Sequence, residues 1–211
     1  MRFAMAGLAL FLLLTGCSTV GGERAEIGEP MIRGEVPIPA APGAVVPASQ
    51  WPDACSLLST GDISAVLLGA TDVEQTPRQV RPRSFPEFAA DQAWTDQTTA
   101  AAGECLFRFR LPGETNANST LWIRVAAVGD PALVEKYFEF TRIAPNVPPG
   151  RHCDANETEV WEATCRQGPL MFRLGGQTAV SFAKNDGPAT SAFWREEVLS
   201  RFAAAAAGKV R

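Results

Sequence analysis

The chain has 211 residues and a formal net charge of −4 at pH 7, and 46% of its residues are hydrophobic while 20% are charged. This composition is typical of a globular domain and excludes a largely disordered chain or one with several membrane spans. The mild acidity argues against general binding to nucleic acid, which relies on a basic surface.

The first residues form an apolar leader that ends in a cysteine. Arg2 supplies a positive charge, and the apolar run after it is too short to span a bilayer. The tetrad Leu14-Thr15-Gly16-Cys17 matches the cleavage site of bacterial lipoproteins, in which small residues precede a cysteine that receives a diacylglyceryl group. We therefore expect a signal peptide over residues 1–16 and lipid, such as palmitate, on Cys17, which would anchor the protein outside the bacterial cell membrane. An ordinary signal peptide cut after Gly22 is the alternative.

Residues 17–50 are rich in Gly, Ala, Pro and Glu and show little apolar periodicity. Segments of this composition act as spacers. We expect a flexible tether of about 33 residues that holds the domain about 30 Å or more from the membrane. Docking of the run from Pro37 to Pro47 on a partner is the alternative. A single domain would then span residues 51–208.

Four cysteines follow the one assigned to lipid, and an even number in an exported chain indicates two disulfides. Of three possible pairings we favour Cys55 with Cys105 and Cys153 with Cys165. The second bridge closes a short loop suited to a hairpin, and the first joins an early helix to a central strand. A metal site is the competing interpretation, but His152 is the only histidine and no Cys-x-x-Cys occurs.

A short first helix is predicted to begin at the capping sequence Ser59-Thr60-Gly61-Asp62 and to end at Gly69. Around it, Cys55-Ser56-Leu57-Leu58-Ser59, Asp62-Ile63 and Leu68-Gly69 resemble the opening motif of a family of secreted actinobacterial lipoproteins that share a domain of unknown function. The family usually has Pro where this chain has Ala54, and Trp is common where it has Phe107. The resemblance implies a fold and a place in the cell envelope, and no reaction.

Residues 76–103 lack a regular pattern and are predicted to form a long loop, a feature that is uncommon unless it is functional or disordered. Three arginines lie beside aromatic residues in this loop. Guanidinium groups suit bidentate contacts with an anion, such as a lipid phosphate or an acidic envelope polymer. The alternative is a solvated loop that its aromatic residues pack in part. The residues concerned are Arg78, Arg81, Arg83, Phe85, Phe88 and Trp94.

Strands and helices alternate in the remainder of the chain. Strands over 105–111 and 121–127 form a predicted hairpin, and a helix begins at Asp130-Pro131 and ends before Pro145. Strands over 159–165, 170–174 and 180–182 follow, with Gly175-Gly176 as a turn, and a last helix spans 189–207 and stops at Gly208.

The predicted order α-β-β-α-β-β-β-α indicates an α+β fold with one antiparallel sheet of about five strands and three helices, mainly on one face. Side chains alternate between the two faces of a strand, and several arginines occupy the positions between the apolar residues. With Trp122 they would form a cationic platform on the uncovered face of the sheet. Solvated arginines on the wet face are the ordinary alternative. The arginines on the strands are Arg108, Arg110, Arg124 and Arg173. The candidate anion-binding residues are Arg78, Arg81, Arg83, Arg108, Arg110 and Arg124.

The sequence contains no Gly-x-Ser-x-Gly and no glycine motif for phosphates or dinucleotides, and His152 lies beside the half-cystine Cys153. We expect no cofactor. The sequence favours a non-enzymatic envelope lipoprotein that binds a ligand or partner outside the membrane, such as an envelope lipid, a glycopolymer or a protein. The alternatives are an enzyme that acts on cell-wall glycans through paired carboxylates, and a structural interaction subunit of an envelope complex.

Overall fold

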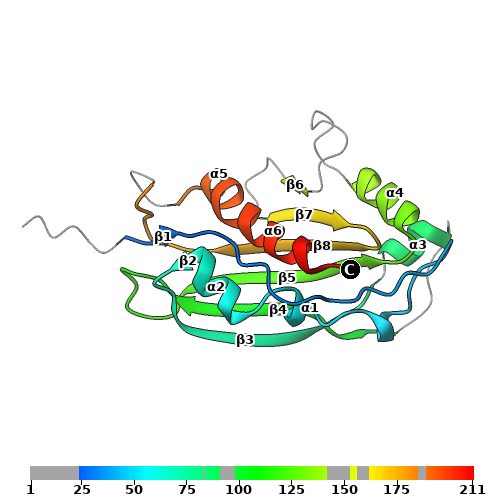
Figure 1. Ribbon diagram of the computed structural model, residues 1–211, viewed down its shortest axis with the longest axis horizontal. Coiled ribbons are helices and arrows are strands. Elements are labelled where there is room, and N and C mark those ends of the chain that lie inside the picture. The colour runs from blue at the N-terminus through cyan, green and yellow to red at the C-terminus, as the bar shows by residue number, and fades with distance from the viewer. Residues whose placement is uncertain (1–23, 83, 91–97, 142–152, 156–161, 185–188) are drawn as a thin grey trace, which may run out of the picture.

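The computed structural model describes residues 24–82, 84–90, 98–141, 153–155, 162–184 and 189–211. Its centre is a six-stranded antiparallel sheet with the strand order β3-β4-β5-β8-β7-β6 (Figure 1). The strands are β3 (Thr71–Val80), β4 (Ala100–Arg110), β5 (Ser119–Val128), β6 (Cys153–Ala155), β7 (Glu162–Gln167) and β8 (Leu170–Gln177). A small second sheet pairs β1 (Glu26–Ile27) with β2 (Leu67–Leu68). The fold is therefore α+β, as the sequence predicts. The predicted order, with about five strands and three helices mainly on one face, differs from the structure, because the described residues contain a six-stranded main sheet, a second small sheet and additional short helices.

The helices pack on both faces of the sheet. They are η1 (Ala48–Gln50), α1 (Ala54–Leu57), α2 (Thr60–Val66), α3 (Ser84–Ala90), α4 (Pro131–Thr141), α5 (Ser191–Phe193), the π-helical η2 (Trp194–Leu199) and α6 (Ser200–Lys209). Helices α1, α2 and α6 lie over one face, whereas α3 and α4 gather at one end of the sheet (Figure 1). None of the helices in the described ranges is long and apolar enough to cross a bilayer.

The face under α1, α2 and α6 carries the main hydrophobic core. Along β4, Cys105, Phe107 and Phe109 are fully buried, and the matching positions of β5 and β8, such as Ile123 and Phe172, are buried as well. The C-terminal helix covers them with Trp194, Val198, Leu199 and Phe202. The alternation predicted over 105–111 and 121–125 is thus confirmed, because one face of these strands forms the main core and the other is less buried, whereas Ala127 packs on the opposite face after an irregularity in β5.

A second cluster fixes α3 and α4 on the opposite face. Met171 points away from its buried neighbour Phe172 and packs with side chains of both helices. Burial raises the pKa of Tyr137 in this cluster, while a hydrogen bond with Ser84 opposes that shift. The members of the cluster are Phe85, Ala127, Val134, Tyr137, Phe138 and Met171.

Residues 24–50 pack against the domain, so the prediction of a free tether is wrong for this stretch. Ala25 forms a bridge with Phe182, Val36 forms one with Val210, and Val45 forms one with Gly129. Side chains are buried at intervals along the segment, and they are those of Ala25, Val36, Ile38, Val46 and Ala48. Prolines suit an extended chain that contacts a surface at intervals, since such a chain needs few backbone donors. The folded domain therefore includes residue 24 onward, whereas Cys17 lies outside the described residues.

Part of the predicted loop over 76–103 is regular structure. Strand β3 extends to Val80, and helix α3 occupies residues 84–90. Strand β3 is an edge strand, and most of its residues are exposed on both faces, so it shows no apolar alternation that the sequence could reveal. Strand β6 was not predicted, and the predicted strand over 180–182 lies outside the main sheet.

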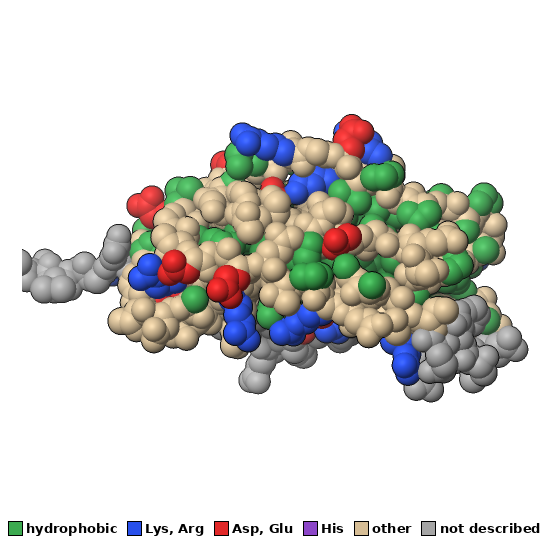
Figure 2. Space-filling view, turned by 90° about the horizontal axis from the view of Figure 1, so that it is seen from below, with side chains coloured by type: hydrophobic (Ala, Val, Ile, Leu, Met, Phe, Trp, Pro, Cys, Tyr) green, Lys and Arg blue, Asp and Glu red, His purple; other side chains and the backbone are tan. Residues whose placement is uncertain are grey.

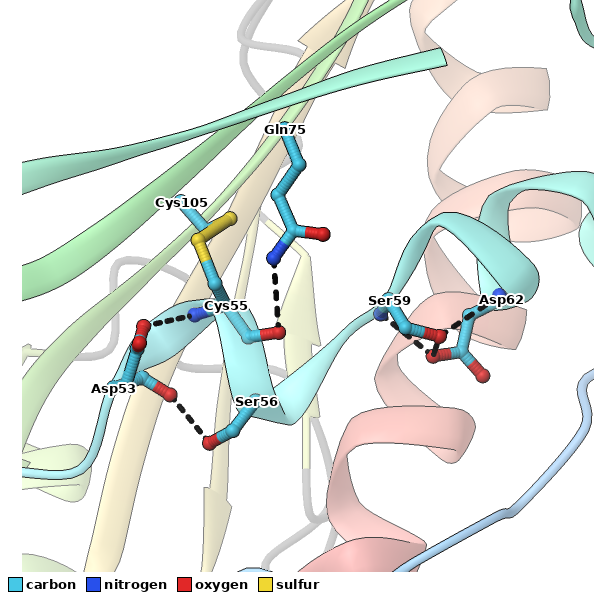
Figure 3. Close-up of a disulfide and its surroundings, with 7 residues drawn as sticks. All are labelled: Asp53, Cys55, Ser56, Ser59, Asp62, Gln75 and Cys105. Atoms are coloured by element: carbon cyan, nitrogen blue, oxygen red, sulfur yellow. Dashed lines mark hydrogen bonds between the residues drawn. A yellow bond between two sulfur atoms is a disulfide. The ribbon is translucent and has the colours of Figure 1, made fainter.

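Both predicted disulfides are confirmed. Cys55–Cys105 joins α1 to β4 with a Cα separation of 5.0 Å, and Cys153–Cys165 joins β6 to β7 with a separation of 4.0 Å. Figure 3 shows the first bridge between the sheet and the start of α1. There the carboxylate of Asp53 accepts a hydrogen bond from the backbone N–H of Cys55 at 2.7 Å, and the side chain of Gln75 donates to the carbonyl of Cys55 at 3.3 Å.

Candidate functional site

The face opposite the main core remains accessible beyond α3 and α4. Residues paired across neighbouring strands share one face of a sheet. The register places three rows of side chains on this face. They are Thr76, Leu106, Trp122, Gly175 and Glu162; Arg78, Glu104, Arg124, Arg173 and Thr164; and Glu74, Arg108, Thr120 and Gln177. Trp122 is partly exposed, and Arg108 and Arg124 are exposed.

A hollow of about 760 Å³ lies beside Trp122. Its volume falls in the range of small-molecule sites, about 300–1,000 Å³. The lining comes from the β4–β5 turn, from three strands and from the chain after β8. The lining residues are Asn118, Thr120, Trp122, Glu162, Gly176, Gln177, Thr178 and Ala179. The hollow thus joins one aromatic ring to amide, hydroxyl and carboxylate groups.

Gly175 lets the indole of Trp122 lie directly over strand β8. A Cβ atom added at Gly175 would lie 2.2 Å from Cζ2 and 2.5 Å from Cε2 of the indole, so a larger residue would push the ring away. The prediction that Gly175-Gly176 is a turn is wrong, because both residues lie within β8. Glycine inside a strand can mark a place where another group approaches the backbone closely. The pair Gly175-Gly176 after the predicted strand 170–174 was therefore a sequence signal for this contact.

Half of the predicted arginine cluster is paired with carboxylates. Nε of Arg124 donates to Oε2 of Glu104 at 2.5 Å, and Nη1 of Arg78 lies 3.6 Å from Oε1 of the same carboxylate, whose residue is only 6% exposed. Nε of Arg110 lies 2.8 Å from Oδ2 of Asp72. Three of the six candidates therefore already have a counter-charge, which weakens their attraction for an anionic ligand.

The remaining candidates are Arg81, Arg83 and Arg108. Arg108 is exposed and faces Glu74 across the pair of strands β3 and β4. Arg81 is exposed after the end of β3, and Arg83 lies outside the described residues. Figure 2, which views the molecule from the side of β3, shows basic and acidic side chains interspersed there.

Facing carboxylates do not occur among the described residues that line the hollow. Glu162 is the one carboxylate in that lining. Glu114 lies in a neighbouring hollow and accepts hydrogen bonds from the backbone N–H of Leu111 at 2.8 Å and from Oγ of Ser119 at 2.9 Å. This geometry gives no support to a glycosidase with two facing acids. His152 lies outside the described residues, within which no three His, Cys, Asp or Glu side chains gather to hold a metal ion.

A second hollow of about 560 Å³ adjoins the first. The two share Asn118 and Ala179, and the second continues past the β4–β5 turn to Glu114 and Arg24. Together they form a path from Trp122 toward the start of the described chain. An elongated ligand could therefore extend beyond a single binding position.

The whole chain was compared with family models, with curated proteins and with solved structures, and none of them matches it.

Proposed function

We propose that the protein is a non-enzymatic lipoprotein of the bacterial cell envelope, and that it binds a ligand in the hollow beside Trp122. The proposal includes a signal peptide over residues 1–16, lipid on Cys17, and membership of the actinobacterial lipoprotein family that the opening motif resembles. The two disulfides support an oxidising compartment outside the cytoplasm.

The arrangement of Trp122 over Gly175 carries the binding part of this proposal. Glycine within a strand costs roughly 0.5–1 kcal/mol relative to alanine, because it loses more backbone freedom on folding. A large aromatic side chain that served only the core would be buried, but Trp122 remains partly accessible next to a hollow. A ring fixed on a strand and left accessible is a suitable contact surface for a ligand.

The test is a pull-down from detergent-solubilised envelopes, with lipids, glycans and proteins in the eluate identified by mass spectrometry. Trp122→Ala should lose species that the wild-type protein retains. Phe140→Ala is the matched control, because Phe140 is 71% exposed and does not line the hollow. Thermal unfolding should confirm that both variants are folded. Identical eluates from wild type and Trp122→Ala would contradict the proposal.

A further inference from the structure

We infer that the ligand of this hollow is a neutral sugar ring, a pyranose of an envelope glycan, that stacks on Trp122. The inference rests on the proposed function and specifies the class of ligand. The charges around the hollow disfavour anionic and cationic ligands, and its polar side chains suit a ligand that carries hydroxyl groups.

An anionic ligand is disfavoured by the charge of the lining. Glu162 contributes a carboxylate, and none of the described lining residues is Lys or Arg. The nearby guanidinium group of Arg124 is engaged by Glu104, which is buried. A phosphate or carboxylate that contacts the lining would therefore meet the like charge of Glu162 and no basic group among the described lining residues.

A cationic ligand is disfavoured by Arg124 itself. Its guanidinium carbon lies 5.4 Å from the centre of the Trp122 ring, within the range of a cation–π contact. An amine ligand would compete with this guanidinium group for the same ring, so the ring would attract it less than an indole without a neighbouring arginine.

An acyl chain is disfavoured by the polar lining. Hydroxyl groups of Thr120 and Thr178 and amide groups of Asn118 and Gln177 surround the hollow. Burying such groups against hydrocarbon, without hydrogen-bond partners, costs about 1–3 kcal/mol for each group. A ligand must therefore supply donors and acceptors around its edge.

A pyranose meets these requirements. Its ring has an apolar C–H surface that can lie on the indole, and its hydroxyl groups both donate and accept hydrogen bonds. The amides offer donors and acceptors, and the carboxylate of Glu162 accepts charge-assisted hydrogen bonds from hydroxyls. Glu162 and Trp122 both face Gly175 across the strands, which places an acceptor beside the stacking surface. The adjoining second hollow gives room for further sugars of the same chain.

The experiment uses two sets of probes with the lipid-free protein. The first is an array of neutral hexose oligosaccharides with sulfated and phosphorylated counterparts. The second consists of vesicles that contain a neutral digalactosyl lipid, compared with vesicles of phosphatidylglycerol. Binding to the neutral oligosaccharides identifies the sugar itself as sufficient, whereas binding only to the digalactosyl vesicles identifies a lipid-borne headgroup. Either result supports the inference.

Three variants test the geometry. Trp122→Ala should weaken binding roughly tenfold or more, and Trp122→Phe should retain part of it. Glu162→Gln should weaken binding through loss of the charged acceptor, and Phe140→Ala should bind as wild type does. Preference for the anionic probes, or neutral binding that survives Trp122→Ala, would overturn the inference. Absence of sugar binding also overturns it, while the proposed function stands if the envelope pull-down still depends on Trp122.

Discussion

Removal of one partner from the buried ion pair between Lys209 and Asp62 should strongly destabilise the domain. Nζ of Lys209 lies 2.6 Å from Oδ2 of Asp62, and the two side chains are 4% and 3% exposed. The same oxygen accepts hydrogen bonds from the backbone N–H and the hydroxyl of Ser59, each at 2.7 Å. The pair therefore fastens the C-terminal end of α6 to the capped N-terminus of α2.

Lys209→Met removes the cation and leaves the carboxylate of Asp62 buried without its counter-charge. Breaking a buried ion pair on one side typically costs about 3–5 kcal/mol. With an m value of about 2 kcal/mol per molar urea, this loss lowers the unfolding midpoint by about 2 M. Asp62→Asn should cost a similar amount, because it leaves the ammonium group unpaired in the interior.

The assay is urea unfolding followed by far-UV circular dichroism, with the disulfides intact and the leader removed. Lys184→Met is the matched control, since Lys184 is exposed and the same change there should alter stability by less than about 0.5 kcal/mol. The double variant of Lys209→Met and Asp62→Asn contains neither charge, so it should lose clearly less stability than the two single losses added together.

Two results would refute this reasoning. The first is a Lys209→Met variant within about 1 kcal/mol of wild type, since a buried unpaired carboxylate costs more than that. The second is strict additivity in the double variant, which would mean that the two groups do not interact.

Three further predictions concern the anchor, the second disulfide and acid stability. Cys17→Ala should abolish lipid labelling and release the protein from membranes, so continued labelling would end the lipobox hypothesis. Replacing Cys153 and Cys165 together by Ala should lower the free energy of unfolding by about 2–4 kcal/mol in a denaturant titration, and an unchanged value would contradict the stabilising role of this bridge. Hydrogen bonds from the backbone, first that of Gly43, lower the pKa of Asp130, so this group contributes stability above its unfolded pKa that is lost as the pH falls through the lower folded value. Asp130→Asn should therefore show a shallower loss of stability below about pH 4 than wild type, and identical acid profiles would count against it.

The sequence was sufficient to predict the position of strands and helices that bury one face. The alternation of Phe107 and Phe109 with Arg108 located β4 and its accessible face, and the capping sequence that begins at Ser59 located α2. The cysteine pairing was correct because chain spacing and predicted elements limited the choice. These inferences depend on local periodicity, which survives in a single sequence.

Elements without such periodicity could not be found in this way. Strand β3 is mostly exposed on both faces, and the segment around Val36 packs through scattered side chains among prolines. The sequence predicted only one part of the site. The alternation of residues along the strand placed Trp122 on the accessible face. Its neighbours Gly175 and Glu162 come from other strands, and their alignment depends on a register that includes an irregularity between Val125 and Ala127 in β5.

The docked N-terminal segment sets how far the protein can reach. Cys17 precedes Arg24 by seven residues, and seven fully extended residues span at most about 25 Å. Arg24 itself lines the second hollow. With the proposed lipid on Cys17, this short linker would keep the domain close to the membrane. The protein would then contact ligands in the membrane-proximal layer of the envelope, and glycans in the outer wall would lie too far from the membrane to reach.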